Sequence, residues 1–217
     1  MTELVNLNKE AEQHTEKVLD WDDEIADEQH DQWLKWLQQL HEVETIHIPR
    51  CYTTKPSIWD EENIQMHIFV DASKDTSAAV VYLRIQSEGK VCCTLLASKT
   101  KVAPIKLTSI PRLELIAALI GARLACTIRQ SLSTPINKIF YWSDSVTVLR
   151  WLRSDAKATK GQFVAFRIAE IQELSNIGNW RYTPSYLNVA DDATKWKKGP
   201  SLNMNDRWFK GPEFHAR

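Results

Sequence analysis

The clearest pattern along the chain is a series of short apolar runs that begins near residue 63. Three runs, at residues 66–71, 78–85 and 91–98, are rich in residues that favour strands and are bounded by polar or turn-forming residues. Only short connections separate them, such as "QSEGK" between the second and the third. Short connections are typical of antiparallel neighbours, so the pattern predicts a three-stranded antiparallel meander.

Helical periodicity follows in "TSIPRLELIAALIGARLACTIRQSL", where Thr108 or Ser109 can cap the helix and Pro111 suits its first turn. Beyond it, "NKIFYWSD" predicts a fourth strand, and Ser143 or Asp144 is expected to cap the next helix, "SVTVLRWLRS". Another helix, "QFVAFRIAEIQELS", and a short fifth strand, "NWRYTPS", complete the pattern. We therefore predict an α/β fold with a mixed five-stranded sheet, in the order βββαβαβα, flanked by helices.

The N-terminal part follows a different pattern. Residues 8–19 predict a polar helix, whereas 31–40 place Trp and Leu at helical spacing and should pack onto another surface. Prolines interrupt the segment that follows, up to residue 62. We predict a small acidic helical extension over residues 1–62, a main domain over 63–195 and a tail over 196–217.

Charge is divided unevenly along the 217 residues. Residues 1–50 carry thirteen Asp and Glu against four Lys and Arg, a balance of −9, and the remainder carries +8. A basic domain is compatible with a polyanionic partner, although the charge can equally keep the surface soluble. The chain has no long apolar run and a polar start, so we expect an intracellular protein that has no membrane partner.

Acidic residues stand at the ends of two predicted strands. Asp71 follows "HIFV" and Asp144 follows "IFYWS", so neighbouring strands would bring the two carboxylates together. Glu114 begins a stripe of Ala and Gly that would let its helix press closely on the sheet. Asp191 and Asp192 follow the fifth strand. Each acid has an alternative role as a turn, cap or first-turn residue, but four anions at one end of a sheet need bound cations.

Oxygen ligands without histidine or cysteine favour Mg²⁺ or Mn²⁺. The four cysteines lack C-x-x-C spacing, and the six histidines are scattered, so neither residue type predicts a metal site of its own. Two hard ions about 3.5 to 4 Å apart suit an in-line phosphoryl displacement. The sequence therefore predicts that Asp71 is a metal ligand rather than only a turn residue.

The series "FVDAS", "PRLEL", "WSDS" and "NVADDATK" resembles the D-E-D-D series of ribonuclease H domains. It resembles most closely the version in polyproteins of BEL/Pao-class LTR retrotransposons. The stretches "LDWDDEI", "IPRCY" and "WFKGPEF" look like further hallmarks of that class, so the resemblance extends over nearly the whole chain from about residue 18. The order and spacing of the motifs together carry the resemblance.

The resemblance implies an RNase H-like fold in which Asp71, Glu114, Asp144 and Asp191 hold two Mg²⁺ ions, which Mn²⁺ can replace, and cut the RNA strand of an RNA/DNA hybrid. Asp191 is preferred to Asp192 because the family pattern reads N-P-A-D. The resemblance also implies a reverse transcriptase connection before the domain, an integrase region after it, and a place in a virus-like particle or the nucleus. Nucleic-acid contacts are expected from Ser73, Lys74, Ser145, Asn188, Arg150 and Arg153.

Several departures and alternatives accompany this interpretation. The loop "TPSYLN" lacks the histidine that many ribonucleases H carry before the last aspartate, which would affect product release. An aspartic peptidase, a label sometimes given to this polyprotein region, needs a D-[ST]-G turn, and Asp75-Thr76-Ser77 lacks the glycine. An integrase-like nuclease needs its acids in the order D-D-E, whereas the order in this chain is D-E-D-D, which disfavours that class. The remaining alternative is a catalytically silent module that binds nucleic acid or another protein.

Overall fold

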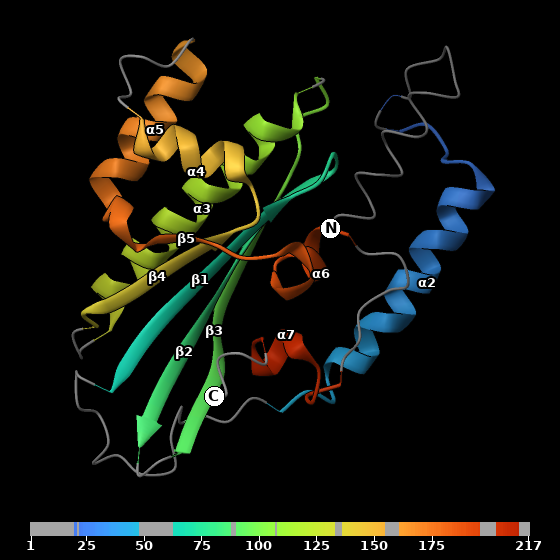
Figure 1. Ribbon diagram of the computed structural model, residues 1–217. Coiled ribbons are helices and arrows are strands. Elements are labelled where there is room, and N and C mark those ends of the chain that lie inside the picture. Colours follow the sequence, from blue (N-terminus) through green and yellow to red (C-terminus); the bar gives the residue numbers. More distant parts are fainter. Residues whose placement is uncertain are drawn as a thin grey trace.

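A twisted five-stranded sheet forms the centre of the molecule (Figure 1). The computed structural model describes residues 20, 22–47, 63–87, 90–106, 108–132, 136–154, 161–195 and 203–212. The spatial order of the strands is β3-β2-β1-β4-β5. Their bounds are β1 Ile64–Ala72, β2 Thr76–Ser87, β3 Lys90–Val102, β4 Lys138–Ser143 and β5 Trp180–Tyr182.

The first three strands form the expected antiparallel meander, whereas β4 pairs with β1 and β5 pairs with β4 in parallel. Parallel pairing needs a long crossover, and α3 (Ile110–Ser131) supplies it between β3 and β4. In the β1–β4 ladder, Val70 stands opposite Ser143. Both strands therefore end at the same end of the sheet, which confirms the mixed five-stranded fold predicted from the sequence.

Three helices, α3, α4 (Val146–Arg153) and α5 (Gln162–Leu174), cover one face of the sheet (Figure 1). The main core lies between α3 and the strands, and the helix approaches β1 through small buried side chains. A Cβ added at Gly121 would lie 2.5 Å from Val70 Cγ1 and 3.1 Å from Ile68 Cγ2. A larger residue at this position would have to displace Val70 or the helix. Gly121 therefore allows the close packing of α3 on β1, and α3 also carries Glu114.

The opposite face carries two short helices, α6 (Asp191–Thr194) and α7 (Arg207–Lys210). A smaller cluster around Phe69, Tyr82 and Trp208 packs between them and the sheet. The Tyr82 hydroxyl donates a hydrogen bond of 2.6 Å to the Trp208 carbonyl oxygen. This bond ties α7 to the sheet. Short 3-10 helices at Ile177–Asn179 and Ser185–Leu187 flank β5.

The helix α2 (Asp27–Val43) confirms the helical pattern near residues 31–40, but none of its seventeen residues is buried. Trp33 and Trp36 stack on each other with ring centroids 4.8 Å apart. Trp33, Trp36 and Leu37 are half-buried, so the expectation that this helix packs onto another surface stays a prediction. The predicted helix at residues 8–19 and the connection at 48–62 lie outside the described residues. Among the helices described, none is long and apolar enough to cross a bilayer.

Candidate metal centre

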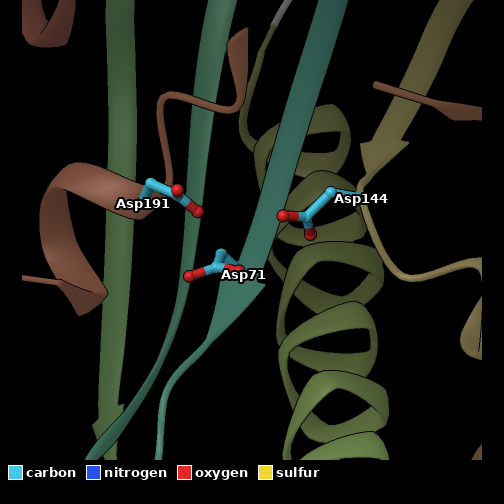
Figure 2. Close-up of side chains that lie close together, drawn as sticks. All are labelled: Asp71, Asp144 and Asp191. Carbon is cyan, nitrogen blue, oxygen red and sulfur yellow. The ribbon is translucent and has the colours of Figure 1, made fainter. Parts of the chain in front are cut away.

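Three aspartates meet at the end of the sheet where β1 and β4 stop (Figure 2). Asp71 lies near the end of β1, Asp144 follows β4, and Asp191 is the first residue of α6. One carboxylate oxygen from each lies within 4.8 Å of the others. The parallel register of β1 and β4 explains the first two positions, because consecutive residues after Val70 and Ser143 stand side by side.

Asp144 is available for this cluster because another residue caps α4. The sequence predicted Ser143 or Asp144 as the cap, but the Ser145 hydroxyl accepts the hydrogen bond from the Val148 backbone nitrogen, at 3.2 Å. The cap prediction is therefore wrong by one or two positions. Ser143 instead accepts a hydrogen bond from the Ser145 nitrogen through its own hydroxyl. The Asp144 carboxylate is left to face the other two aspartates.

Asp71 is the most buried of the three acids, with 4% of its surface exposed. The pKa of its carboxyl is raised to about 7, mainly by burial and also by the charges of Asp191 and Asp144, against the lowering effects of the Thr194 hydrogen bond and Lys195. The Thr194 hydroxyl donates to Asp71 Oδ2. A buried carboxyl in such company is costly to ionise unless a cation arrives.

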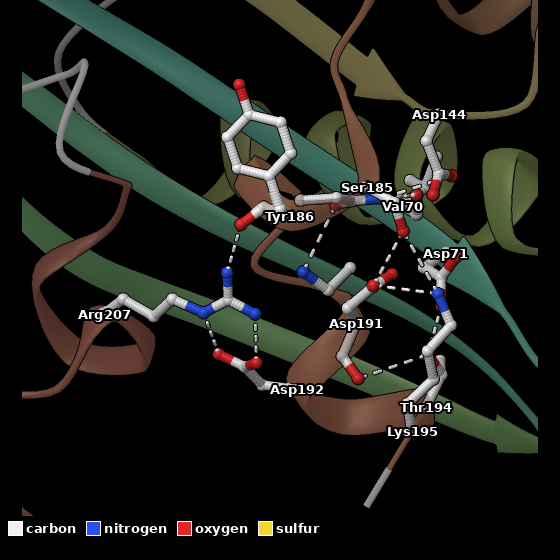
Figure 3. Close-up of polar contacts among 12 residues, drawn as sticks. Val70, Asp71, Asp144, Ser185, Tyr186, Asp191, Asp192, Thr194, Lys195 and Arg207 are labelled. Carbon is white, nitrogen blue, oxygen red and sulfur yellow. Dashed lines mark hydrogen bonds and ion pairs between the residues drawn. The ribbon is translucent and has the colours of Figure 1, made fainter.

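Asp191 is held by two donors on one oxygen and by none on the other (Figure 3). The Ser185 hydroxyl donates to Oδ2 at 2.9 Å, and the Lys195 ammonium donates to the same atom at 2.8 Å. Oδ1 is buried and has no hydrogen-bond partner among the described residues. A buried carboxylate oxygen without a donor is a position where a cation would be stabilising.

Glu114 lies beside the cluster rather than within the group of three. It lies in the second turn of α3, half-buried, and accepts a hydrogen bond of 2.5 Å from the Ser145 hydroxyl. Burial raises the pKa of its carboxyl, the Ser145 bond opposes this, and the charge of Asp144 raises it further. Ser145 thus connects the start of α4 to the fourth acid of the predicted set.

Asp192, the alternative to Asp191, is engaged elsewhere. Both of its carboxylate oxygens accept hydrogen bonds from the Arg207 guanidinium, on α7. Arg207 also donates to the Tyr186 carbonyl oxygen at 2.6 Å. Asp192 therefore joins α6 to α7, while Asp191 faces the aspartates at the strand ends, as Figure 3 shows.

The cluster fits a hard divalent cation on three counts. It offers only carboxylate oxygens. One of them, Asp191 Oδ1, is buried without a partner among the described residues, and burial together with the charges of the neighbouring aspartates raises the pKa of Asp71. Mg²⁺ and Mn²⁺ prefer oxygen ligands of this kind. Lys195 is the cation that the chain itself supplies, and the charges of all three aspartates act on its ammonium.

Of the residues expected to contact nucleic acid, two are buried and make internal hydrogen bonds. Ser145 caps α4 and bonds Glu114, and Asn188, fully buried, donates to the Val70 carbonyl oxygen at 3.0 Å. Ser73 shapes the β1–β2 turn by accepting from the backbone nitrogens of two following residues. Lys74 and Arg150 are exposed, and so is Arg153, which donates to the Trp180 carbonyl oxygen.

The sequence prediction missed three residues that hold the acids: Ser185, Thr194 and Lys195. For Lys195 a signal was present, because it lies four residues after Asp191, the spacing of an ion pair on one helical face. Thr194 had no such signal, since its contact with Asp71 spans 123 positions of the chain.

A mixed sheet of order β3-β2-β1-β4-β5, with aspartates where β1 and β4 end, defines an RNase H-like domain. Residues 4–145 match the family described as the Pao retrotransposon-like RNaseH-like domain, and the chain belongs to that family. The match includes Asp71, Glu114 and Asp144 but ends before Asp191, which the folded structure adds to the cluster. No curated protein sequence matches the chain.

Solved structures with a similar fold include three that are distant in sequence. The N-terminal RNase H domain of a Mycobacterium tuberculosis protein is 14% identical, with a TM-score of 0.44, over 61% of this chain and 91% of that chain. LC11-RNase H1, solved with an RNA/DNA hybrid, is 15% identical, with a TM-score of 0.40, over 59% and 91%. The foamy viral protease-reverse transcriptase, solved with double-stranded DNA, is 12% identical, with a TM-score of 0.36, over 84% and 30%.

Proposed function

We propose that the chain is a Mg²⁺-dependent endoribonuclease that cleaves the RNA strand of RNA/DNA hybrids during reverse transcription of a retrotransposon. The observation that carries the proposal is the aspartate cluster at the strand ends of an RNase H-like sheet, in which Asp191 Oδ1 has no partner among the described residues. In this proposal, reverse transcriptase and integrase regions of a parent polyprotein are its partners, in a virus-like particle or the nucleus.

Asp71, Asp144 and Asp191 would hold the cations, with Glu114 supporting them from α3. Bound divalent ions would supply an activated water and neutralise charge on the phosphate during its in-line displacement. The chain's own part is to orient the carboxylates: Thr194 fixes Asp71, and Ser185 fixes Asp191. We expect products that end in 5′-phosphate and 3′-hydroxyl groups.

Recognition of the hybrid would depend on backbone shape and 2′-hydroxyl groups rather than on base edges, so we expect little sequence preference. Lys74, in the turn after β1, and Arg150, on α4, are exposed on elements that adjoin the acids. The buried Ser145 and Asn188 would support the site rather than contact the hybrid.

Cleavage of an end-labelled RNA/DNA hybrid tests the proposal. The wild-type chain should cut the RNA strand in Mg²⁺ and in Mn²⁺ but not in EDTA, and Asp71→Asn should lower the rate by at least about a hundredfold. Glu173→Gln, which neutralises an exposed acid on α5, is the matched control and should keep full activity. Absence of metal-dependent cutting by the wild-type chain would refute the proposal.

The same experiment addresses the second candidate, a silent binding module. Four acids kept together without a cation cost stability, so a module that only binds would gain from losing them. Hybrid binding by a wild-type chain that cleaves with neither metal would favour this alternative. Equal binding of hybrid and of unrelated duplexes would identify it as a general nucleic-acid surface.

A further inference from the structure

A row of aromatic side chains lies on the face of the sheet that carries α6 and α7. The parallel register of β1 and β4 sets His67 beside Phe140. Two residues further along each strand, Phe69 stands beside Trp142 on the same face. The ring centroid of His67 lies 5.1 Å from that of Phe140 and 6.0 Å from that of Trp142. The two short helices lie mainly over the other strands, because α6 packs on β1 and β2 and α7 packs on β3 (Figure 1).

Hydrogen bonds to the one polar ring hold this row in place. The indole Nε1 of Trp142 can only donate, and it donates to His67 Nδ1 at 3.1 Å. The proton of the neutral imidazole is therefore on Nε2, which donates to Gln65 Oε1 at 3.1 Å. His67 is buried, so water does not compete for either bond. Rings that are already ordered can stack a planar ligand at little cost in conformational entropy.

Arg181, on the edge strand β5, lies over the row. It stands beside Trp142 in the β4–β5 ladder, and its guanidinium carbon is 4.3 Å from the centre of the Phe140 ring. The side chain is exposed and has no carboxylate partner among the described residues. One face of the guanidinium therefore rests on an aromatic ring, while the other is accessible to a ligand. A planar cation held in this way can stack on a nucleobase.

The charge on this part of the sheet is positive up to the aspartates. Lys138 is exposed and alternates onto the same face of β4 as Phe140. Along β1, β4 and β5, the first acids on this face are Asp71 and Asp144, at the strand ends. Rings interleaved with cations are typical of surfaces that bind nucleic acid. We call this surface the β4–β5 face, and it is formed by Lys138, Phe140, Trp142 and Arg181.

The stacking geometry selects a single strand rather than a duplex. The bases of a duplex stack on each other, whereas those of an unpaired strand are free to stack on a protein ring or guanidinium. The β4–β5 face also lies close to the aspartates, because Trp142 precedes Asp144 by two residues, about 7 Å along a strand. A strand that continued past the aspartate cluster would therefore meet this face next.

We propose that the β4–β5 face binds single-stranded nucleic acid, with a base stacked on the outer side of Arg181 and a phosphate beside Lys138. Phe140 positions the guanidinium from below. This binding goes beyond cleavage of a hybrid and requires no metal ion, so it stands or falls independently of the proposed function. A hybrid with a single-stranded overhang should bind more tightly than a blunt one, because the overhang reaches the face.

The test is fluorescence anisotropy of a labelled single-stranded DNA of about twelve nucleotides, a length within the range that such surfaces bind. The full chain should bind it in EDTA at low salt. Arg181→Ala should bind at least about tenfold more weakly, because one base loses its stacking partner. Arg129→Ala, which removes an exposed cation from the last turn of α3, on the other face of the sheet, is the matched control and should bind like the wild type.

Two further variants separate stacking from charge. Arg181→Lys keeps the charge but loses the planar group, so it should bind several-fold more weakly with an unchanged salt dependence. Lys138→Gln should lower the slope of log affinity against log salt by about 0.7, the value for one phosphate contact to a single strand. Urea unfolding of each variant checks that the fold is kept.

Three results would overturn the proposal. The first is a wild-type chain that does not bind the single strand, and the second is Arg181→Ala binding as tightly as the wild type. The third is Arg181→Lys binding like the wild type, since charge alone would then explain the affinity. Self-association of the wild-type chain that Arg181→Ala abolishes, without oligonucleotide binding, would assign the β4–β5 face to a second copy of the chain instead.

Discussion

At the scale of single residues, the centre depends on carboxylates kept close together by neutral donors and one lysine. Thr194 and Ser185 each satisfy one oxygen, Lys195 provides the positive charge, and Asp191 Oδ1 is left without a partner among the described residues. Such an arrangement is costly without a metal ion, because three anions share a partly buried volume. The cost should be measurable as a loss of stability.

The pH dependence of stability should reveal the charge on Asp71. Its pKa is raised to about 7 in the folded chain by burial and by Asp144 and Asp191, against an ordinary 3.8, while Lys195 opposes the increase. A raised pKa in the folded state stabilises the fold at low pH, and that contribution is lost as pH rises toward 7. In EDTA, the free energy of unfolding should fall by roughly 2–3 kcal/mol between pH 5 and 8.

The comparison that isolates this effect is Asp71→Asn, measured by urea unfolding over the same pH range. Asparagine keeps an acceptor for the Thr194 hydroxyl but carries no charge. We expect the free energy of unfolding of this variant not to fall between pH 5 and 8, and to be higher than that of the wild type at pH 8. Parallel pH curves for the two proteins would show that Asp71 does not titrate in this range. Other acids near the cluster, including Glu114, are unchanged in both proteins.

Lys195 should compete with a divalent ion for the cluster. Its ammonium donates to Asp191 at 2.8 Å and to Ser185 at 3.2 Å, and it must leave Asp191 when a cation takes its place. We therefore expect Lys195→Met to bind Mn²⁺ several-fold more tightly in calorimetry without nucleic acid. Lys195→Arg keeps the charge and serves as the control. Unchanged or weaker Mn²⁺ binding by Lys195→Met would contradict this role.

At the scale of elements, close packing of α3 on β1 positions the acids. The small residues of α3 bring the helix onto the sheet, and Gly121 allows the closest approach, against Val70. Val70 is followed directly by Asp71, and α3 carries Glu114 two turns before Gly121. Any change in the spacing of helix and strand therefore moves two of the four acids relative to each other.

The substitution Gly121→Ala tests this packing. Alanine favours helices by about 1 kcal/mol over glycine, but its Cβ would lie 2.5 Å from a buried methyl group of Val70. The cost of overpacking should exceed the gain in helix preference, so we expect the free energy of unfolding, measured in urea, to fall by about 1–3 kcal/mol. Gly178→Ala, whose Cβ would meet only the Asn176 side-chain oxygen at 3.2 Å, should cost less. Equal costs at the two positions would indicate that α3 can shift freely.

The sequence predicted the elements better than their contacts. Apolar runs and turn signals located all five strands, and Pro111 marked the start of α3, because these features depend on local pattern. The cap of α4 was assigned to the wrong residue, since Ser143, Asp144 and Ser145 are all good cap residues and only tertiary contacts select one. The strand ends predicted Asp71 and Asp144 as neighbours, whereas the contacts of Thr194 and Arg207 depend on the folded chain.

At the scale of the whole molecule, the two parts of the chain carry opposite charge. Residues 1–50 carry −9 and the remainder +8, and α2 begins with acidic residues. A hybrid approaching the basic part meets the attraction of that part and the repulsion of the acidic one. The N-terminal segment should therefore weaken hybrid binding through its field, without any direct contact with the hybrid.

Neutralising α2 tests this effect in the full chain. The triple variant Asp27→Asn, Glu28→Gln and Asp31→Asn removes three negative charges from residues that are exposed. In an Asp71→Asn background, which should prevent cleavage, it should bind a labelled hybrid several-fold more tightly at low salt by fluorescence anisotropy. The advantage should disappear near 0.5 M salt, where screening shortens the range of the field to a few ångström. A charge-conserving triple variant, Asp27→Glu, Glu28→Asp and Asp31→Glu, should bind like its parent, and an advantage that persists at high salt would indicate a direct contact instead.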